Sequence, residues 1–255
     1  MAEIFNAPLN INTNDISTNA ATGTPGLTTA LSTTVKYIGT GSWSFDGTDT
    51  SSIADDIAGA GEKNGVTWPH IAAYDLGDAP FTIQGHVRFN DSTDQVFMSD
   101  YRSTGSERVW YLRRMTTNGG TWRFGWYFNG VTISTLEYIA TIDIDRWYHI
   151  AVVREVAVPA TSSRIVLYLD GTRVGDDLVG ALAFHSATPV NLLRMGQYDS
   201  GATSLPLNGY MDNWSIHTET LYTEDFTPPM GGGGAMGIST PSGISIIPGV
   251  TTGEL

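Results

Sequence analysis

The sequence contains no cysteine among its 255 residues, so no disulfide bond can stabilise the fold. Charged residues are also few, at 15% of the chain, against about 25% in an average soluble domain. The surface must therefore be covered largely by threonine, serine, asparagine and glycine. Packing, association with other subunits or a bound metal must supply the stability that disulfides would otherwise give.

Basic residues are scarce as well: 13 Lys and Arg stand against 26 Asp and Glu, for a net charge of −13. Because no run of Lys or Arg is available to displace counterions from phosphates, we expect no nucleic-acid binding and no binding to anionic membranes. No apolar run approaches the roughly 20 residues that span a bilayer. The first residues, Met1 to Asn6, lack the basic and apolar regions of a signal peptide. We therefore expect synthesis in the cytoplasm of a host cell.

Amphipathic helical patterns are missing, and strands separated by Gly and Asp turns dominate from Val35 to about Pro229. Two β-hairpins are predicted, at Asn129-Gly130 and at Asp170-Gly171, because these pairs accept the positive φ angles of tight turns. Between them, Trp147 to Val153 is nearly continuously apolar, which predicts a strand buried on both faces.

Many short strands without helices predict an all-β, two-sheet antiparallel jelly-roll sandwich. One domain of 255 residues can bury such a core. We assign residues 1–229 to this domain, including an N-terminal polar arm, and residues 230–255 to a Gly/Ser/Pro-rich C-terminal arm. Trp147 and Trp214 are predicted to point into the core.

Four stretches, in this order, resemble the laminin-G-like and concanavalin A-like superfamily, particularly its stand-alone microbial and viral members. They are Gly41–Gly47 (GSWSFDG), Phe81–Val87 (FTIQGHV), Arg146–Val152 with Ile165–Gly171, and Leu193–Gly196 with Leu207–Trp214. The sequence departs from the usual pattern at His86, where Trp is common, and at Asn213, where Glu is usual. This jelly-roll fold hosts lectins, adhesion modules, glycosidases and inert spacers, so the resemblance indicates fold better than function.

The resemblance implies a structural calcium site, since many relatives carry one at the sandwich edge and Asp46 and Asp212 occupy the matching motifs. Carboxylate oxygens suit this hard cation. The alternative, which we favour, is that Asp46 serves the Asp-Gly turn and Asp212 accepts backbone hydrogen bonds. No other cofactor is expected.

Catalysis by related glucanases uses carboxylates in an E-x-D-x-x-E pattern, which is absent here. Asp143 and Asp145 have same-face spacing, but they precede the Trp147 strand where a solvated loop is the better interpretation. The five histidines are scattered, and no nucleophile elbow, phosphate loop or dinucleotide motif is present. We therefore predict that the protein is not an enzyme.

Aromatic residues offer candidate sugar contacts. Trp122, Phe124, Trp126 and Phe128 alternate and so share one sheet face. Such a row could stack on sugar rings, but it more often forms core, which we favour here. Trp68 and Trp110 have polar neighbours, and we predict that these two are exposed and contact carbohydrate.

The C-terminal arm carries a short apolar anchor, Ile244, Ile246 and Ile247, suited to clasping a neighbouring subunit. With the low-charge surface and the expected cytoplasmic synthesis, it favours a virion protein: a bacteriophage capsid decoration (cement) or tail-associated protein. Its partners would be the major capsid or other virion proteins and, in a homo-oligomer, its own copies. The alternative is a glycan-binding, lectin-like adhesion module for cell-surface polysaccharide. A polysaccharide hydrolase with an unrecognised site is a weaker third hypothesis.

Overall fold

The structure is a computed structural model that describes residues 3–8, 16–26, 28–48, 65–101, 108–127, 133–157, 163–179, 192–197 and 205–229. The strands in these ranges are β1 (Glu3–Ala7), β2 (Thr24–Pro25), β3 (Ala30–Ser32), β4 (Ser42–Asp46), β5 (Val66–Pro69), β6 (Phe81–Phe89), β7 (Gln95–Tyr101), β8 (Arg108–Met115), β9 (Thr121–Tyr127), β10 (Ile133–Ile139), β11 (Trp147–Glu155), β12 (Arg164–Leu169), β13 (Thr172–Val179), β14 (Leu192–Met195) and β15 (Asn208–His217). Two short 3₁₀ turns, η1 (Ala72–Tyr74) and η2 (Thr117–Gly119), complete the described elements. No helix in these ranges has the length and apolar character needed to cross a membrane.

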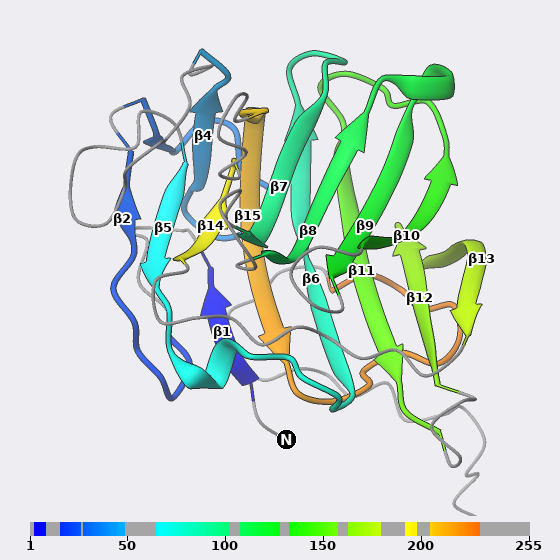
Figure 1. The fold of residues 1–255 in the computed structure, drawn as a ribbon. Helices are drawn as coiled ribbons and strands as arrows, with labels where there is room; N and C mark the ends of the chain where they lie inside the picture. The colour runs from blue at the N-terminus through cyan, green and yellow to red at the C-terminus, as the bar shows by residue number, and fades with distance from the viewer. Residues whose placement is uncertain are drawn as a thin grey trace, which may run out of the picture.

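The strands form two antiparallel sheets (Figure 1). The eight-stranded sheet has the order β13-β12-β11-β6-β15-β4-β3, with β1 also paired to β15. The seven-stranded sheet has the order β10-β9-β8-β7-β14-β5-β2. Neighbouring strands are often distant in sequence, as in the β6–β15 and β7–β14 pairs. The predicted all-β, two-sheet jelly-roll sandwich is confirmed.

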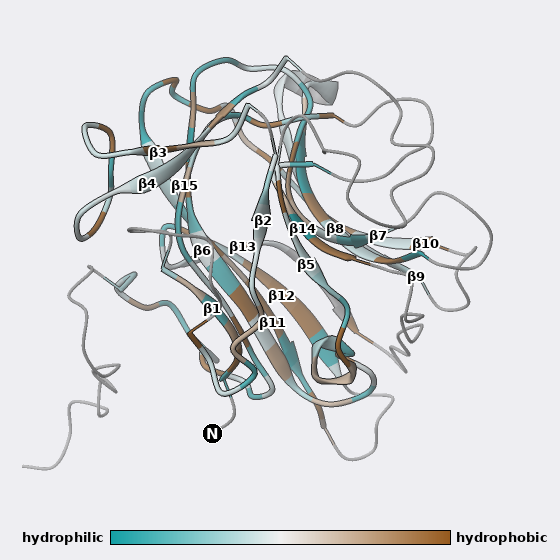
Figure 2. Cartoon of the chain, turned by 90° about the vertical axis from the view of Figure 1, so that its left-hand side faces the viewer, coloured by the Kyte–Doolittle hydropathy of each residue, from teal (hydrophilic) through white to brown (hydrophobic). Residues whose placement is uncertain are grey.

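Inward-facing and outward-facing residues alternate along the strands, and the inward-facing ones form the core between the two sheets. Figure 2 shows the sheets as two layers. Phe81, Ile83 and Val87 point inward from β6 and are buried. Across the core, Trp122, Phe124 and Trp126 point inward from β9 and are also buried. The core interpretation of this aromatic row is therefore correct for these three rings, while Phe128 lies outside the described residues.

Both predicted strand pairings are present, and the two-residue turn is described for one of them. Strands β9 and β10 pair antiparallel with Tyr127 opposite Ile133, whereas Asn129 and Gly130 lie outside the described residues. Strands β12 and β13 pair with Leu169 opposite Thr172, which leaves Asp170 and Gly171 as a two-residue turn. These two residues have φ angles of 52° and 79°, the positive values that such a turn requires.

The two tryptophans expected in the core take different positions. Trp214 is fully buried, lies against Gly85 on the neighbouring strand, and donates its indole N–H to the His86 carbonyl at 3.0 Å. Trp147, by contrast, is half-buried and lies beside Tyr37 on the outer face. The prediction for Trp147 is wrong because β11 is apolar on both faces, so its sequence does not reveal which side chains point inward.

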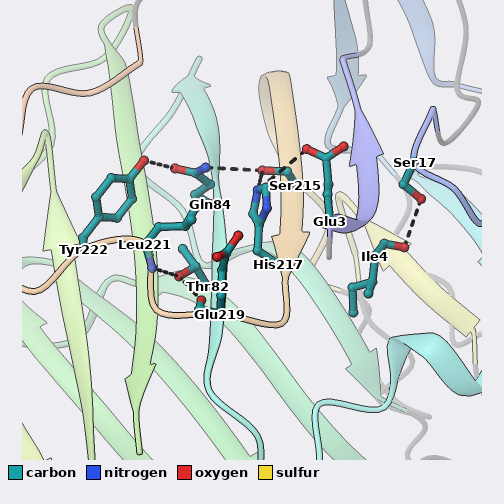
Figure 3. Close-up of polar contacts among 10 residues, drawn as sticks. All are labelled: Glu3, Ile4, Ser17, Thr82, Gln84, Ser215, His217, Glu219, Leu221 and Tyr222. Atoms are coloured by element: carbon teal, nitrogen blue, oxygen red, sulfur yellow. Dashed lines mark hydrogen bonds and ion pairs between the residues drawn. The ribbon is translucent and has the colours of Figure 1, made fainter. Parts of the chain in front are cut away.

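Segment 218–229 packs on the outer face of the eight-stranded sheet, and Figure 3 shows its polar contacts with Thr82 and Gln84 of β6. Thr82 accepts a hydrogen bond from the Leu221 N–H at 3.0 Å and donates one to the Glu219 carbonyl at 2.8 Å. Tyr222 donates its hydroxyl to Gln84 Oε1 at 2.7 Å. Apolar contacts complete this covering, since Tyr222 and Phe226 pack on the outward residues Ala151, Val153, Val166 and Tyr168.

Three buried titratable residues, His149, His86 and Asp212, lie side by side on neighbouring strands of the same outer face; we call them the buried row. His86 lies directly opposite His149 on one side and Asp212 on the other. The Tyr37 ring stacks on His86 at 3.9 Å between centroids, and Phe226 contacts the His149 ring edge-on. Burial lowers the pKa of His86 to about 3 and also depresses the pKa of His149. Burial raises the pKa of Asp212 to about 7, although backbone N–H groups oppose the rise.

Candidate functional site

The outer face of the seven-stranded sheet carries a second aromatic cluster, separate from the core. Strand β8 turns Trp110 and Leu112 inward, so the alternating residues Tyr111 and Arg113 point outward. Three tyrosines, Tyr101, Tyr111 and Tyr127, pack together there with Val96, and Leu205 packs against them. We call this surface the tyrosine–arginine face; it consists of Tyr101, Tyr111, Tyr127, Arg108, Arg113 and Arg123.

Gly125 shapes the middle of the tyrosine–arginine face. It lies directly opposite Tyr111 in the β8–β9 pair. A Cβ atom at Gly125 would stand 2.5 Å from Cζ of the Tyr111 ring, which is closer than any side chain allows. The absence of a side chain at this position therefore makes room for the outer end of the Tyr111 ring over β9.

Three half-buried arginines surround these rings. The Arg113 guanidinium lies 4.8 Å from the centroid of the Tyr111 ring, and that of Arg108 lies 5.9 Å from both Tyr101 and Tyr127. Arg123 pairs with Glu137 of β10 at 2.5 Å. Burial, with a further contribution from Tyr101, raises the pKa of Tyr127, so its phenol stays neutral. The three rings are themselves buried, at 8%, 4% and 6% exposure for Tyr101, Tyr111 and Tyr127, so the half-buried arginines are the part of this face that can donate hydrogen bonds to a sugar.

The two tryptophans predicted to contact carbohydrate are buried instead. Trp68 has 0% of its surface exposed and Trp110 has 1%, and both belong to the core between the sheets. Trp68 contacts the Phe5 ring at 5.0 Å, and Trp110 lies opposite Trp126. The predicted exposure was wrong because the polar neighbours in the sequence occupy the other face of each strand.

The two aspartates of the implied calcium site do not come together. Asp46 lies opposite Asn208, which is four residues from Asp212 along β15 and so roughly 13 Å away at ~3.3 Å per residue. Asp46 is exposed and accepts hydrogen bonds from the N–H and hydroxyl of Thr48. Asp212 Oδ2 accepts the N–H groups of Tyr37 and Ile38 at 3.1 and 2.9 Å. These contacts agree with the turn and backbone-acceptor roles.

Within the described ranges, no group of three or more His, Cys, Asp or Glu side chains is placed to hold a metal ion. The Asp143–Asp145 pair is exposed, at 77% and 66% of the two side chains, in the turn before β11. Asp145 pairs with Arg88 at 2.8 Å and Asp143 lies 3.7 Å from Arg146. This is the solvated turn that the sequence favoured. Ile244, Ile246 and Ile247 lie outside the described residues.

The site that does form was missed by the sequence analysis. Its signal is a pair of outward-facing alternations, Tyr111-x-Arg113 and Arg123-x-Gly125-x-Tyr127. The two become one surface only when β8 and β9 are paired in the observed register.

The two-sheet sandwich defines a lectin-like jelly roll, and comparison with known proteins agrees. The chain belongs to the concanavalin A-like lectin/glucanases superfamily, whose family description matches residues 59–225. A comparison with curated protein sequences finds no match.

Solved structures share this fold at low sequence identity. The binding domain of Paraclostridial Mosquitocidal Protein 1 superposes with a TM-score of 0.61 at 13% identity, over 87% of this chain and 50% of that one. Domain 4 of AbnA, a GH43 extracellular arabinanase from Geobacillus stearothermophilus in complex with arabinotriose, gives 0.57 at 11% identity, over 86% and 93%. The binding domain of botulinum neurotoxin DC in complex with SialylT gives 0.54 at 12% identity, over 87% and 48%. The chain thus spans about half the length of the two toxin binding domains.

Proposed function

We propose that this protein is a non-enzymatic glycan-binding module and that the tyrosine–arginine face is its binding surface. One observation carries the proposal: the half-buried arginines Arg108 and Arg113 lie over tyrosine rings outside the core, on the outer face of the seven-stranded sheet. The rings beneath them are buried, with Tyr111 4% exposed, and they hold the guanidinium groups in place. The arginine N–H groups can donate to the hydroxyls of a sugar.

The likeness to a domain solved with arabinotriose and to a toxin binding domain solved with SialylT supports the same proposal. The rest of the molecule offers a weaker alternative surface. The outer face of the eight-stranded sheet is largely occupied by segment 218–229.

The test is a glycan microarray that carries both neutral and acidic polysaccharides. We expect the wild-type chain to bind, Tyr111→Ala to lose most of the signal, and Tyr210→Ala to keep it. Tyr210 is a matched control because it also lies beside an arginine, 5.2 Å from the Arg88 guanidinium, but on the other sheet. Circular dichroism and a thermal melt check that each variant is folded. Absence of binding to any glycan, or loss in Tyr210→Ala alone, contradicts the proposal.

The proposal includes the absence of hydrolysis. Glycoside hydrolysis needs two carboxyl groups on either side of one bond, with one of them protonated. Asp143 and Asp145 lie in an exposed turn, and each lies beside an arginine rather than in a cleft that could enclose a sugar. We expect no release of reducing ends from a bound polysaccharide. Release that disappears in Asp143→Asn or Asp145→Asn would show an enzyme instead.

We propose a second role in the same protein: a structural component of a virus particle, as a bacteriophage capsid decoration or tail-associated protein. The observation that favours assembly is an exposed apolar edge. Ile133 and Ile139 are 41% and 57% exposed on β10, the last strand of the seven-stranded sheet. Because β13 lies against the middle of β10 at Gly175, it is these exposed side chains, not a free backbone edge, that another chain could bury.

The C-terminal arm is the part to remove in testing this second role. We expect deletion of residues 231–255 to leave the β-type circular dichroism spectrum unchanged and to abolish homo-oligomer formation or attachment to a shell. Size-exclusion chromatography with light scattering and co-sedimentation with purified particles measure these two outcomes. A truncated chain that assembles and attaches like the full chain contradicts the structural role and leaves glycan binding unaffected.

A further inference from the structure

Two arginines face each other on the tyrosine–arginine face. Arg113 of β8 and Arg123 of β9 are direct cross-strand partners, so their side chains leave the same face of the sheet at adjacent positions. Like charges directly opposite one another destabilise a sheet. The chain carries only 13 basic residues against 26 acidic ones, so opposed arginines are an unusual use of them.

Only one of the two charges is balanced. Arg123 pairs with Glu137, its neighbour on the far side. On the near side, Arg113 faces Val96, and no ion pair within the described residues involves it. The Nε atoms of both arginines are buried and have no hydrogen-bond partner. The pair therefore retains one uncompensated positive charge and two unsatisfied buried donors.

An anion between the two guanidinium groups would remove the first of these costs. It would neutralise the second charge and accept N–H groups from the ends of the two guanidinium groups. A guanidinium presents its donors in a planar fork that matches the oxygen atoms of a carboxylate or sulfate group. The Tyr111 ring is buried beneath Arg113 and supports its half-buried guanidinium next to this anion position.

We infer that the tyrosine–arginine face takes acidic glycans, with the anionic group of one sugar held between Arg113 and Arg123. The inference rests on the proposed glycan-binding function and names its ligand class. Uronic acid, sialic acid and sulfated sugars share the chemistry that this pair recognises. Because the whole chain carries a net charge of −13, nonspecific attraction does not favour such polymers, and a local site has to supply the affinity.

Titration calorimetry with the full chain tests the inference. The probes are polygalacturonate, its methyl ester on the same backbone, polysialic acid and dextran sulfate, with dextran as the neutral control. We expect at least one acidic polymer to bind at least tenfold more tightly than its neutral counterpart. We also expect Arg113→Gln to weaken that binding about tenfold, as for the loss of one charge-assisted hydrogen bond. Arg113→Lys, which keeps the charge without the fork, should fall between the two.

Arg146→Gln is the matched control. Arg146 also lies over a tyrosine ring, 4.6 Å from the centroid of Tyr148, and its removal changes the net charge equally. Equal weakening by Arg113→Gln and Arg146→Gln shows a general charge effect and overturns the subsite. Equal binding of acidic and neutral polymers that still requires Tyr111 overturns the inference and preserves the proposed function. No binding to any polymer overturns both.

Discussion

The two sheets present outer faces of different kinds. On the eight-stranded sheet, the chain covers its own surface: segment 218–229 packs on Ala151 and Tyr168, and Thr82 and Gln84 bond to that segment. On the seven-stranded sheet, Arg113 points outward without a carboxylate partner, directly opposite another arginine. Both faces hold buried polar atoms without hydrogen-bond partners, such as the ring nitrogens of His86 and the Nε atom of Arg113. The difference lies in what covers each face: one is covered by its own chain, whereas the other presents a guanidinium group without an ion pair among the described residues, which a ligand would explain.

The largest expected loss of stability distinguishes a tryptophan in the core from one on the outer face of the eight-stranded sheet. Trp214→Ala removes a fully buried indole and its hydrogen bond to the His86 carbonyl, and we expect a loss of about 3–5 kcal/mol in unfolding free energy. Trp147→Ala removes a half-buried ring from the outer face and should cost only about 1–2 kcal/mol. Urea unfolding followed by circular dichroism measures both. Equal losses at the two positions would mean that Trp147 is also a core residue.

The hairpins show how much of this fold local sequence determines. Asp170-Gly171 identifies a two-residue turn because few residues accept positive φ there. The direction of side chains is harder to predict. Trp147 and Trp110 lie on strands flanked by both apolar and polar residues, and only the assembled sheet decides which face is inside. The arginine pair was missed for the same reason, since Arg113 and Arg123 are joined by a cross-strand register.

The second prediction concerns acid stability of the covered face. His86 is neutral in the fold, with its pKa lowered from 6.5 to about 3, so the unfolded chain binds more protons between these values. Its contribution to stability is therefore full above pH 6.5 and is lost as pH falls toward 3. His149 acts in the same direction. The groups that face this pair are Asp212 on β15 and the Tyr37 ring.

Asp212 acts in the opposite direction. Its pKa is raised from 3.8 to about 7, so the folded chain binds more protons between these values. Its contribution is full below pH 3.8 and is lost as pH rises through 7. In urea titrations from pH 4 to 8, we expect His86→Gln to reduce the loss of stability on acidification. Asp212→Asn should steepen that loss. Parallel curves of unfolding free energy against pH for the wild type and both variants would contradict the shifted pKa values of His86 and Asp212.

The same Gly→Ala change at Gly85 and at Gly125 compares the core with the outer face of the seven-stranded sheet. A methyl group at Gly85 meets the buried Trp214 indole, whereas one at Gly125 meets the outer end of the Tyr111 ring. We expect Gly85→Ala to cost up to about 3 kcal/mol and Gly125→Ala to cost about 1 kcal/mol, because the outer ring can shift. Chemical denaturation measures both costs. Gly125→Ala should nevertheless weaken glycan binding, and unchanged binding would place the ligand away from Tyr111.

The smallest expected change in unfolding free energy is that of Arg113→Gln, and its sign shows whether this arginine stabilises the sheet. Without ligand, Arg113→Gln relieves the repulsion with Arg123, so we expect unfolding free energy to stay level or to rise by about 0.2–1 kcal/mol. The matched change Arg146→Gln removes an ion pair with Asp170 at 2.7 Å and should lower stability by up to about 1 kcal/mol. Denaturant titration at low and high salt separates the two cases, because screening reduces both differences. A loss in Arg113→Gln as large as that in Arg146→Gln would mean that Arg113 stabilises the sheet. The arginine pair would then be structural, and the contrast between the two outer faces would lose its main evidence.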